Sequence, residues 1–166
     1  MEFVSCDPSN YRAGRTQPVR YIVMHYTANN GDTAKNNCDY YHRVGGLQAS
    51  AHYFVDEHGA MQSVREGDTA WHCGARAYWH PECRNANSIG IEMCSRKRAD
   101  GSYYIKPETV ANAAALALRH GQHGAAGEHA GDGRFRQRQP GLQAPAARAA
   151  AAGGGRGRKC HGGGAV

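Results

Sequence analysis

No stretch of this sequence is apolar over the roughly 20 residues that a membrane-spanning helix needs, so we expect no transmembrane segment. The first ten residues also lack the apolar stretch of a secretory signal peptide. The 166 residues have room for one domain of ordinary size. We therefore expect a protein that is made in the cytoplasm and needs help from another protein to leave it.

Paired cysteines are also missing. The six cysteines form no CxxC motif and show no zinc-ribbon spacing. They are too scattered along the chain to indicate a disulfide framework. Their positions are Cys6, Cys38, Cys73, Cys83, Cys94 and Cys160.

Positive charge is unevenly distributed along the chain. Residues 1–118 contain 12 basic and 12 acidic residues, so the net charge of +6 arises entirely in residues 119–166. That segment also holds 13 of the 22 glycines and contains no Ile, Tyr, Trp or Met. It cannot bury enough apolar surface to offset the entropy lost on ordering. We therefore predict an N-terminal loop over 1–18, a domain over 19–118 and a disordered tail over 119–166.

The tail by itself raises the hypothesis of an Arg/Gly-rich nucleic-acid-binding protein. Such segments interleave aromatic residues with arginines so that bases can stack on them. The tail offers only Phe135 for this purpose. We therefore expect no specific nucleic-acid partner.

Hydrophobic patterns in the first part of the chain predict strands that alternate with helices. The run VRYIVMHYTA predicts a buried central strand, and Asp32 or Thr33 caps the helix that follows it. Pro107 suits the first turn of a second helix. The elements predicted after the first strand are a helix over Thr33–Arg43, a hairpin over Ser50–Asp56 and Ala60–Arg65, a strand over Ser88–Cys94, and a helix from Lys106 to Leu118.

Two polar residues interrupt the apolar strands. His25 places a metal-capable nitrogen at the end of a rigid element, although a lone histidine at a strand end is more often structural. Glu92 is costly to bury unless its carboxylate has a charged or hydrogen-bonded role. The alternative for Glu92 is a solvent-facing position on an edge strand.

Four motifs occur in a fixed order: VMHYTA at Val23–Ala28, SAHYFVDEHG at Ser50–Gly59, AWHCG at Ala70–Gly74 and SIGIEM at Ser88–Met93. Together they resemble the zinc-dependent N-acetylmuramoyl-L-alanine amidases, a family shared by phage endolysins and peptidoglycan-recognition proteins. The resemblance extends from about Tyr11 to Leu118. It implies an α/β fold, a mixed central β-sheet flanked by helices, with a groove over the sheet and Zn²⁺ at its floor. Because the resemblance stops at the change of composition, we expect this fold to be incomplete at the C-terminus.

The resemblance also implies roles for individual residues. His25 matches the first zinc ligand, and Glu92 matches the strand glutamate that assists catalysis. His52 and Tyr53 match groove residues next to the metal. His52 would hydrogen-bond the developing oxyanion or the substrate carbonyl, or else form part of a polar strand face.

A loop with aromatic side chains matches the substrate groove of the family. Trp71 and His72 are its candidate substrate-binding residues. Trp71, Tyr78 and Trp79 would stack on sugar or peptide, or else only pack the loop against the domain.

The implied reaction is hydrolysis, by zinc-activated water, of the amide that joins N-acetylmuramic acid to L-alanine in bacterial peptidoglycan. The enzyme would act on the cell wall as a monomer. The alternative is a non-catalytic peptidoglycan-binding module of the same fold. The presence of both His25 and Glu92 favours the enzyme, because a pure binder needs neither.

The match fails where the zinc site should close. A catalytic zinc needs three protein ligands, and in the family the second and third follow the last long helix. Leu118–His120 imitates the start of that segment, while His129 and Cys160–His161 lie in Gly/Ala/Arg-rich sequence. The simplest hypothesis is a change of reading frame near Leu118. An open alternative frame that encodes a histidine and then Lys-x-Cys-Pro would support it, and the lack of one would exclude it.

Overall fold

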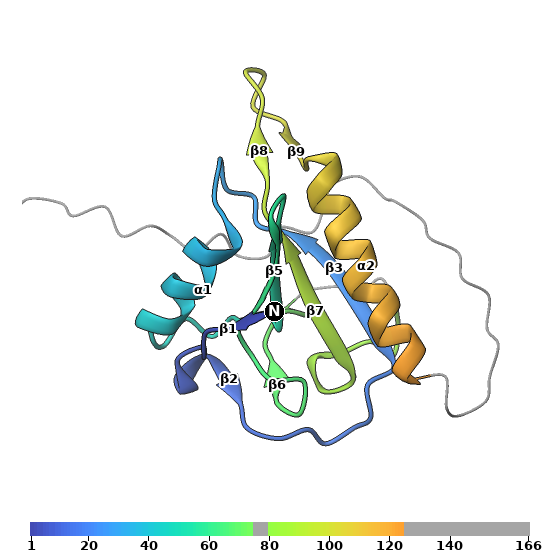
Figure 1. The fold of residues 1–166 in the computed structure, drawn as a ribbon. Coiled ribbons are helices and arrows are strands. Elements are labelled where there is room, and N and C mark those ends of the chain that lie inside the picture. Colours follow the sequence, from blue (N-terminus) through green and yellow to red (C-terminus); the bar gives the residue numbers. More distant parts are fainter. Residues whose placement is uncertain (75–79, 125–166) are drawn as a thin grey trace, which may run out of the picture.

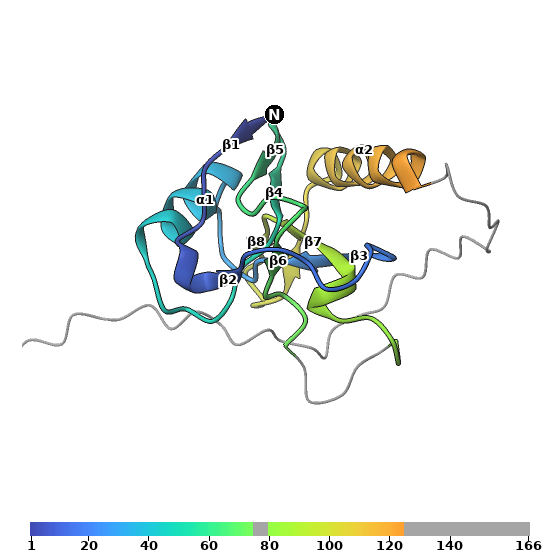
Figure 2. The same cartoon turned by 90° about the horizontal axis from the view of Figure 1, so that it is seen from below.

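The computed structural model describes residues 1–74 and 80–124 of the chain. Within these residues, five strands form one mixed sheet in the order β1-β5-β4-β7-β3 (Figures 1 and 2). The strands β3, β7 and β4 run parallel, β5 is antiparallel to β4, and β1 is parallel to β5. Their bounds are β1 Glu2–Phe3, β3 Tyr21–Tyr26, β4 Tyr53–Asp56, β5 Gly59–Gln62 and β7 Ser88–Met93. The predicted mixed sheet and its hairpin are confirmed.

Short elements surround this sheet. The segment 1–18 differs from the predicted loop, because it contributes β1 to the sheet edge and also contains η1 and β2. Strands of two residues are too short to show a period-two pattern in the sequence. The short elements outside the main sheet are η1 Pro8–Asn10, β2 Tyr11–Arg12 paired with β6 Thr69–Ala70, η2 Asn85–Asn87, and β8 Arg96–Lys97 paired with β9 Tyr103–Tyr104.

The strand that carries His25 lies at an edge of the sheet. Its single neighbour in the described part of the chain is β7, so within that part the expectation of a central strand is wrong. Residues 21–25 are half-buried, and Tyr26 is exposed. The strand is apolar because Ile22 and Met24 pack against the main core on one face. The apolar composition of this strand therefore comes from the packing of one face against the core. It does not require a neighbouring strand on each side.

Two helices flank the sheet on opposite faces (Figures 1 and 2). Helix α1 spans Ala34–Arg43 and begins at its N-cap Thr33, one of the two predicted caps, whose Oγ1 accepts a hydrogen bond from the Asn36 N–H at 3.1 Å. Helix α2 spans Pro107–Gly124, so it continues past Leu118, where the composition changes. No helix in the described part of the chain is long and apolar enough to cross a membrane.

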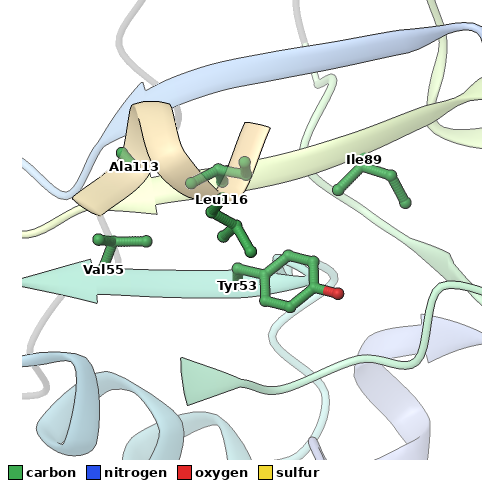
Figure 3. Packing of buried hydrophobic residues seen from close by; sticks show 6 residues of the cluster. Tyr53, Val55, Ile89, Ala113 and Leu116 are labelled. Atoms are coloured by element: carbon green, nitrogen blue, oxygen red, sulfur yellow. The ribbon is translucent and has the colours of Figure 1, made fainter. Parts of the chain in front are cut away.

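Alternate residues of the strands supply two separate cores. Tyr53, Val55, Ile89 and Ile91 pack against Ala113 and Leu116 of α2 (Figure 3). On the other face, Phe54 packs against Ala34 and Cys38 of α1. Because successive side chains of a strand point to opposite faces, the residues between those of the α2 core face the α1 side. That side carries the candidate site.

Candidate functional site

His25 and Glu92 lie side by side on adjacent strands. The parallel pairing of β3 with β7 puts His25 opposite Glu92, and β4 places Phe54 on the other side of Glu92. Residues that are opposite each other in a ladder project to the same face. The histidine and the glutamate that the sequence singled out therefore meet on the face opposite α2.

The His25 imidazole is neutral at physiological pH. Burial lowers the pKa of His25 to about 4, because the charged form loses its hydration. Its Nε2 atom lies 3.2 Å from Nδ1 of His72, and the two rings meet edge to face with centroids 5.4 Å apart. His25 thus has a second imidazole as its partner.

The loop after β6 holds His72 in this position. The side-chain oxygen of Asn85 accepts hydrogen bonds from the backbone N–H groups of His72 and Cys73, at 2.9 and 2.7 Å. The His72 ring lies directly over Gly90, where a Cβ atom would come within 2.5 Å of Cγ of the histidine. Burial lowers the pKa of His72 well below its ordinary value, with His25 adding to the effect. His72 is therefore a buried, neutral ligand-type side chain.

Among the residues that the structure describes, one carboxylate oxygen of Glu92 has no hydrogen-bond partner. Its Oε2 atom is buried and unpaired among the described residues. Burial raises the pKa of Glu92 to about 7, and the negative charge of Asp32 adds to the shift. The alternative of a solvent-facing residue on an edge strand is wrong, because β7 lies between β4 and β3.

His52 is completely buried next to His72. Its Nδ1 accepts a hydrogen bond from the Gly90 N–H at 3.0 Å, and its Nε2 lies 2.6 Å from Nη2 of Arg15. Burial lowers the pKa of His52 to about 3, with the Arg15 charge as the next cause. Both ring nitrogens therefore face other protein groups, and the predicted contact of His52 with substrate stays a prediction.

Tyr53 lies on the opposite face of the sheet. It pairs with Ile91, is buried in the core under α2, and donates its hydroxyl proton to Glu66. Its predicted place beside His25 in the groove is therefore wrong. The cause is the period-two alternation of β4, which sends adjacent residues to opposite faces.

The remaining sequence candidates lie elsewhere. Trp71 is half-buried and borders an open pocket of about 270 Å³ that Arg12, Arg84 and Asn85 also line. His120, on α2, lies 3.3 Å from Glu66 and packs on Tyr53, on the face away from His25. Outside the described residues lie Tyr78, Trp79, His129, Cys160 and His161.

Arg15 was missed by the sequence analysis. Its guanidinium bonds to the backbone carbonyl of Ser88 at 3.0 Å, contacts His52, and also reaches the backbone of Glu66. Nothing local in the sequence marks this arginine. By contrast, Gly90 within the SIGIEM strand is a residue type that often marks the close approach of another group to the backbone. It could therefore have indicated a neighbour such as His72.

Comparison with known proteins decides the family. Residues 15–140 match the family model described as N-acetylmuramoyl-L-alanine amidase. The chain belongs to this family. The match continues beyond Leu118, the point at which the motif resemblance ended.

Curated amidases show the relationship at the level of sequence. N-acetylmuramoyl-L-alanine amidase CwlL of Bacillus licheniformis is 39% identical over 107 residues, which cover 59% of this chain and 28% of that protein. The amidase BlyA of Bacillus subtilis (strain 168) is 35% identical over 105 residues, covering 54% of this chain and 27% of its own. The chain thus spans little more than a quarter of the length of these relatives.

Solved structures confirm the amidase fold. The catalytic domain of XlyA is 26% identical, with a TM-score of 0.55 over 75% of this chain and 78% of that one. A mutant endolysin from Bacillus subtilis is 27% identical, with a TM-score of 0.54 over 75% and 79%. Both agree with the mixed α/β architecture.

The amidase family is generally zinc-dependent, and a catalytic zinc needs three protein ligands. The described residues contain no group of three or more His, Cys, Asp or Glu that could hold a metal ion. They do contain two neutral imidazoles whose nitrogens face each other, in His25 and His72. Within residues 1–74 and 80–124, the neighbouring groups of a type that binds zinc are therefore two imidazole nitrogens, which lie beside a carboxylate.

Proposed function

We propose that this domain hydrolyses the amide bond between the lactyl group of N-acetylmuramic acid and L-alanine in bacterial peptidoglycan. One observation carries the proposal. Glu92 presents a buried oxygen that has no hydrogen-bond partner within residues 1–74 and 80–124, next to His25 on the same face of the sheet. An uncompensated carboxylate of this kind is costly to the fold and is typical of acid–base catalysis.

In this proposal His25 holds zinc and Glu92 handles the proton. Zinc would act as a Lewis acid that polarises the scissile carbonyl and lowers the pKa of bound water. Glu92 Oε2 takes the proton of the attacking water and gives it to the amide nitrogen as the C–N bond breaks. The pKa of Glu92, about 7, suits a group that must first accept and then release a proton near neutral pH.

The substrate side of the proposal rests on the loop that contains Trp71 and His72. This loop borders the face that carries His25, and the half-buried Trp71 ring offers a surface for sugar or peptide. We propose that the protein acts as a monomer on the bacterial cell wall. His52 would then position Gly90 and His72 from below, through its contacts with Arg15 and with the backbone.

Purified cell walls incubated with the zinc-loaded full chain test this function. We expect release of stem peptides that carry a new N-terminal L-alanine, identified by mass spectrometry. Glu92→Gln should lower the rate by roughly 10²–10⁴-fold, as loss of general acid–base catalysis does. His25→Ala should abolish the reaction, because it removes the residue proposed to hold zinc. His58→Gln, on the exposed β4–β5 turn, is the matched control and should retain the wild-type rate.

A second candidate is a peptidoglycan-binding module without catalysis. It is favoured by the lack of any three-donor metal group within residues 1–74 and 80–124. In that case the wild-type protein would sediment with cell walls and release no peptide, and Glu92→Gln would leave binding unchanged. That pair of results would replace the hydrolase proposal.

A further inference from the structure

Two cysteines that are ten positions apart in the sequence bring their thiols together beside the loop after β6. The side chains of Cys73 and Cys83 share a hydrogen bond, and both thiols are free. Burial raises the pKa of Cys73 to about 11, and the contact with Cys83 adds to the shift. The spacing of the cysteines in the sequence does not indicate this pair, because it depends on how Cys73 packs against the segment before β7.

Hydrogen bonds hold Cys73 against the segment that contains Cys83. The Cys73 N–H donates to the side-chain oxygen of Asn85 at 2.7 Å, and the Cys73 thiol lies 3.6 Å from Oγ of Ser88. Ser88 Oγ in turn donates to the carbonyl of Arg84, the residue after Cys83, at 2.7 Å. The position of Cys73 is therefore fixed by contacts other than the one between the two sulfurs.

The segment around Cys83 is fixed by hydrogen bonds of its own. The Asn87 side chain donates to the carbonyl of Glu82 at 3.0 Å and accepts from the N–H of Arg84 at 2.8 Å. These bonds hold the backbone on both sides of Cys83. Two reacting groups that are held close together on fixed segments have a high effective concentration, because the entropy of bringing them together is already lost.

Exposure also distinguishes this pair from the other cysteines of the described residues. Cys73 and Cys83 are half-buried, so a small oxidant can reach their sulfur atoms. The remaining described thiols are buried, in Cys6, Cys38 and Cys94. Because oxidation of thiols depends on their access to solvent, the half-buried pair is the one that should react.

We propose that Cys73 and Cys83 form a redox-sensitive disulfide when the protein meets a low-molecular-weight disulfide such as oxidised glutathione. One thiol attacks the small disulfide and releases half of it as a thiol, which leaves a mixed disulfide on the protein. The second cysteine then attacks the protein-bound sulfur and releases the other half as a thiol. The protein loses two electrons and two protons, and the small disulfide takes up both as it becomes two thiols.

The cross-link joins the loop that carries Trp71 and His72 to the segment before η2. Disulfides persist in oxidising surroundings outside the cytoplasm, where the proposed cell-wall substrate lies. That setting rests on the function proposed above, whereas the pairing of the two thiols does not. We therefore expect the pair to be reduced in the cytoplasm and cross-linked at the cell wall.

Peptide mapping of the full chain by mass spectrometry, after equilibration in glutathione redox buffers, tests the pairing. The oxidised wild-type protein should contain one intramolecular link, between Cys73 and Cys83. Cys73→Ser and Cys83→Ser should each lose it. Cys160→Ser is the matched control and should form the link as the wild type does. The effective concentration of the two thiols should exceed that of the urea-unfolded chain, which is in the millimolar range, by at least about tenfold.

Three results would overturn the inference. The first is a folded wild-type protein that gains glutathione adducts at Cys73 or Cys83 and forms no link between them. The second is a link from either residue to another cysteine of the chain. The third is an equal effective concentration in the folded and the unfolded chain, which would mean that the fold does not bring the thiols together. None of these measurements depends on hydrolysis, so a failure of the proposed amidase activity leaves the inference in place.

Discussion

At the scale of single residues, the site depends on the absence of a side chain at position 90. His72 reaches His25 only by lying over the backbone of β7, and the nearest ring atom is 2.5 Å from where a Cβ at position 90 would be. Real carbon atoms do not approach so closely, so either the ring or the strand would have to shift. Glycine inside a strand ordinarily destabilises it. Here the missing side chain leaves the space that the His72 ring occupies.

The first prediction follows from this contact. Gly90→Ala should lower the free energy of unfolding by about 1–3 kcal/mol, the usual cost of overpacking, as measured by urea denaturation. Gly67→Ala is the matched control, because a Cβ there meets nothing within 4 Å. Equal stability of the two variants would mean that His72 can leave its position at no cost.

At the scale of elements, ion pairs connect the β4–β5 turn to two later segments. Glu57, in that turn, bonds to Arg96 of β8 at 3.0 Å and to Lys106, just before α2, at 2.8 Å. The hydrogen bond from Lys106 is the main cause that lowers the pKa of Glu57 to about 2. All three side chains are at least partly shielded from solvent, so this pairing exceeds an ordinary surface ion pair.

The second prediction concerns pH. Because the folded-state pKa of Glu57 lies below its ordinary value of 4.5, the stabilisation is complete above about pH 4.5 and is lost as the pH falls towards 2. Glu57→Gln should lower stability by about 1–2 kcal/mol at pH 7 and by little at pH 2, measured by chemical denaturation at each pH. A pH-independent difference would contradict this account.

The control for that experiment is an ion pair in open solvent. Lys35 and Asp39 are one helical turn apart on α1, and their side chains are 65% and 38% exposed. Asp39→Asn should change stability much less than Glu57→Gln does, because solvent screens an exposed helical pair.

At the scale of the whole molecule, the sheet separates two environments. One face buries alternate apolar residues of β4 and β7 under α2, among them Tyr53, Val55 and Ile89 (Figure 3). The other face brings His25, His72 and Glu92 together. Helix α2 ends at Gly124, and its His120 contacts Glu66, so the helix continues into the segment that we predicted to be a tail. The division of the chain near residue 118 stays a prediction.

Limited proteolysis tests that division. Tryptic cleavage should occur first among the arginines from Arg134 onwards, because a Gly/Ala/Arg-rich segment cannot bury enough surface to protect itself. Mass spectrometry should then show a persistent fragment that starts at Met1 and ends near Arg134. Protection of the arginines after residue 124 would mean that this segment packs on the domain.

The sequence by itself determined the local elements and the chemistry of the two main candidates. The strand around His25, the cap at Thr33 and the hairpin after Ser50 follow from periodicity and turn residues, which act over a few positions. The cost of burying Glu92 follows equally from its apolar neighbours in the strand.

Only the tertiary structure decided which residues meet. It put the strand of His25 at the sheet edge, turned Tyr53 to the opposite face, and brought His72 to His25 across 47 positions of the chain. Strand order and facing depend on hydrogen-bonded pairing between distant segments and on a one-residue choice of face. A local sequence pattern contains no information on strand pairing or on the choice of face. Only the tertiary structure therefore shows that His72, packed over Gly90, is the partner of His25.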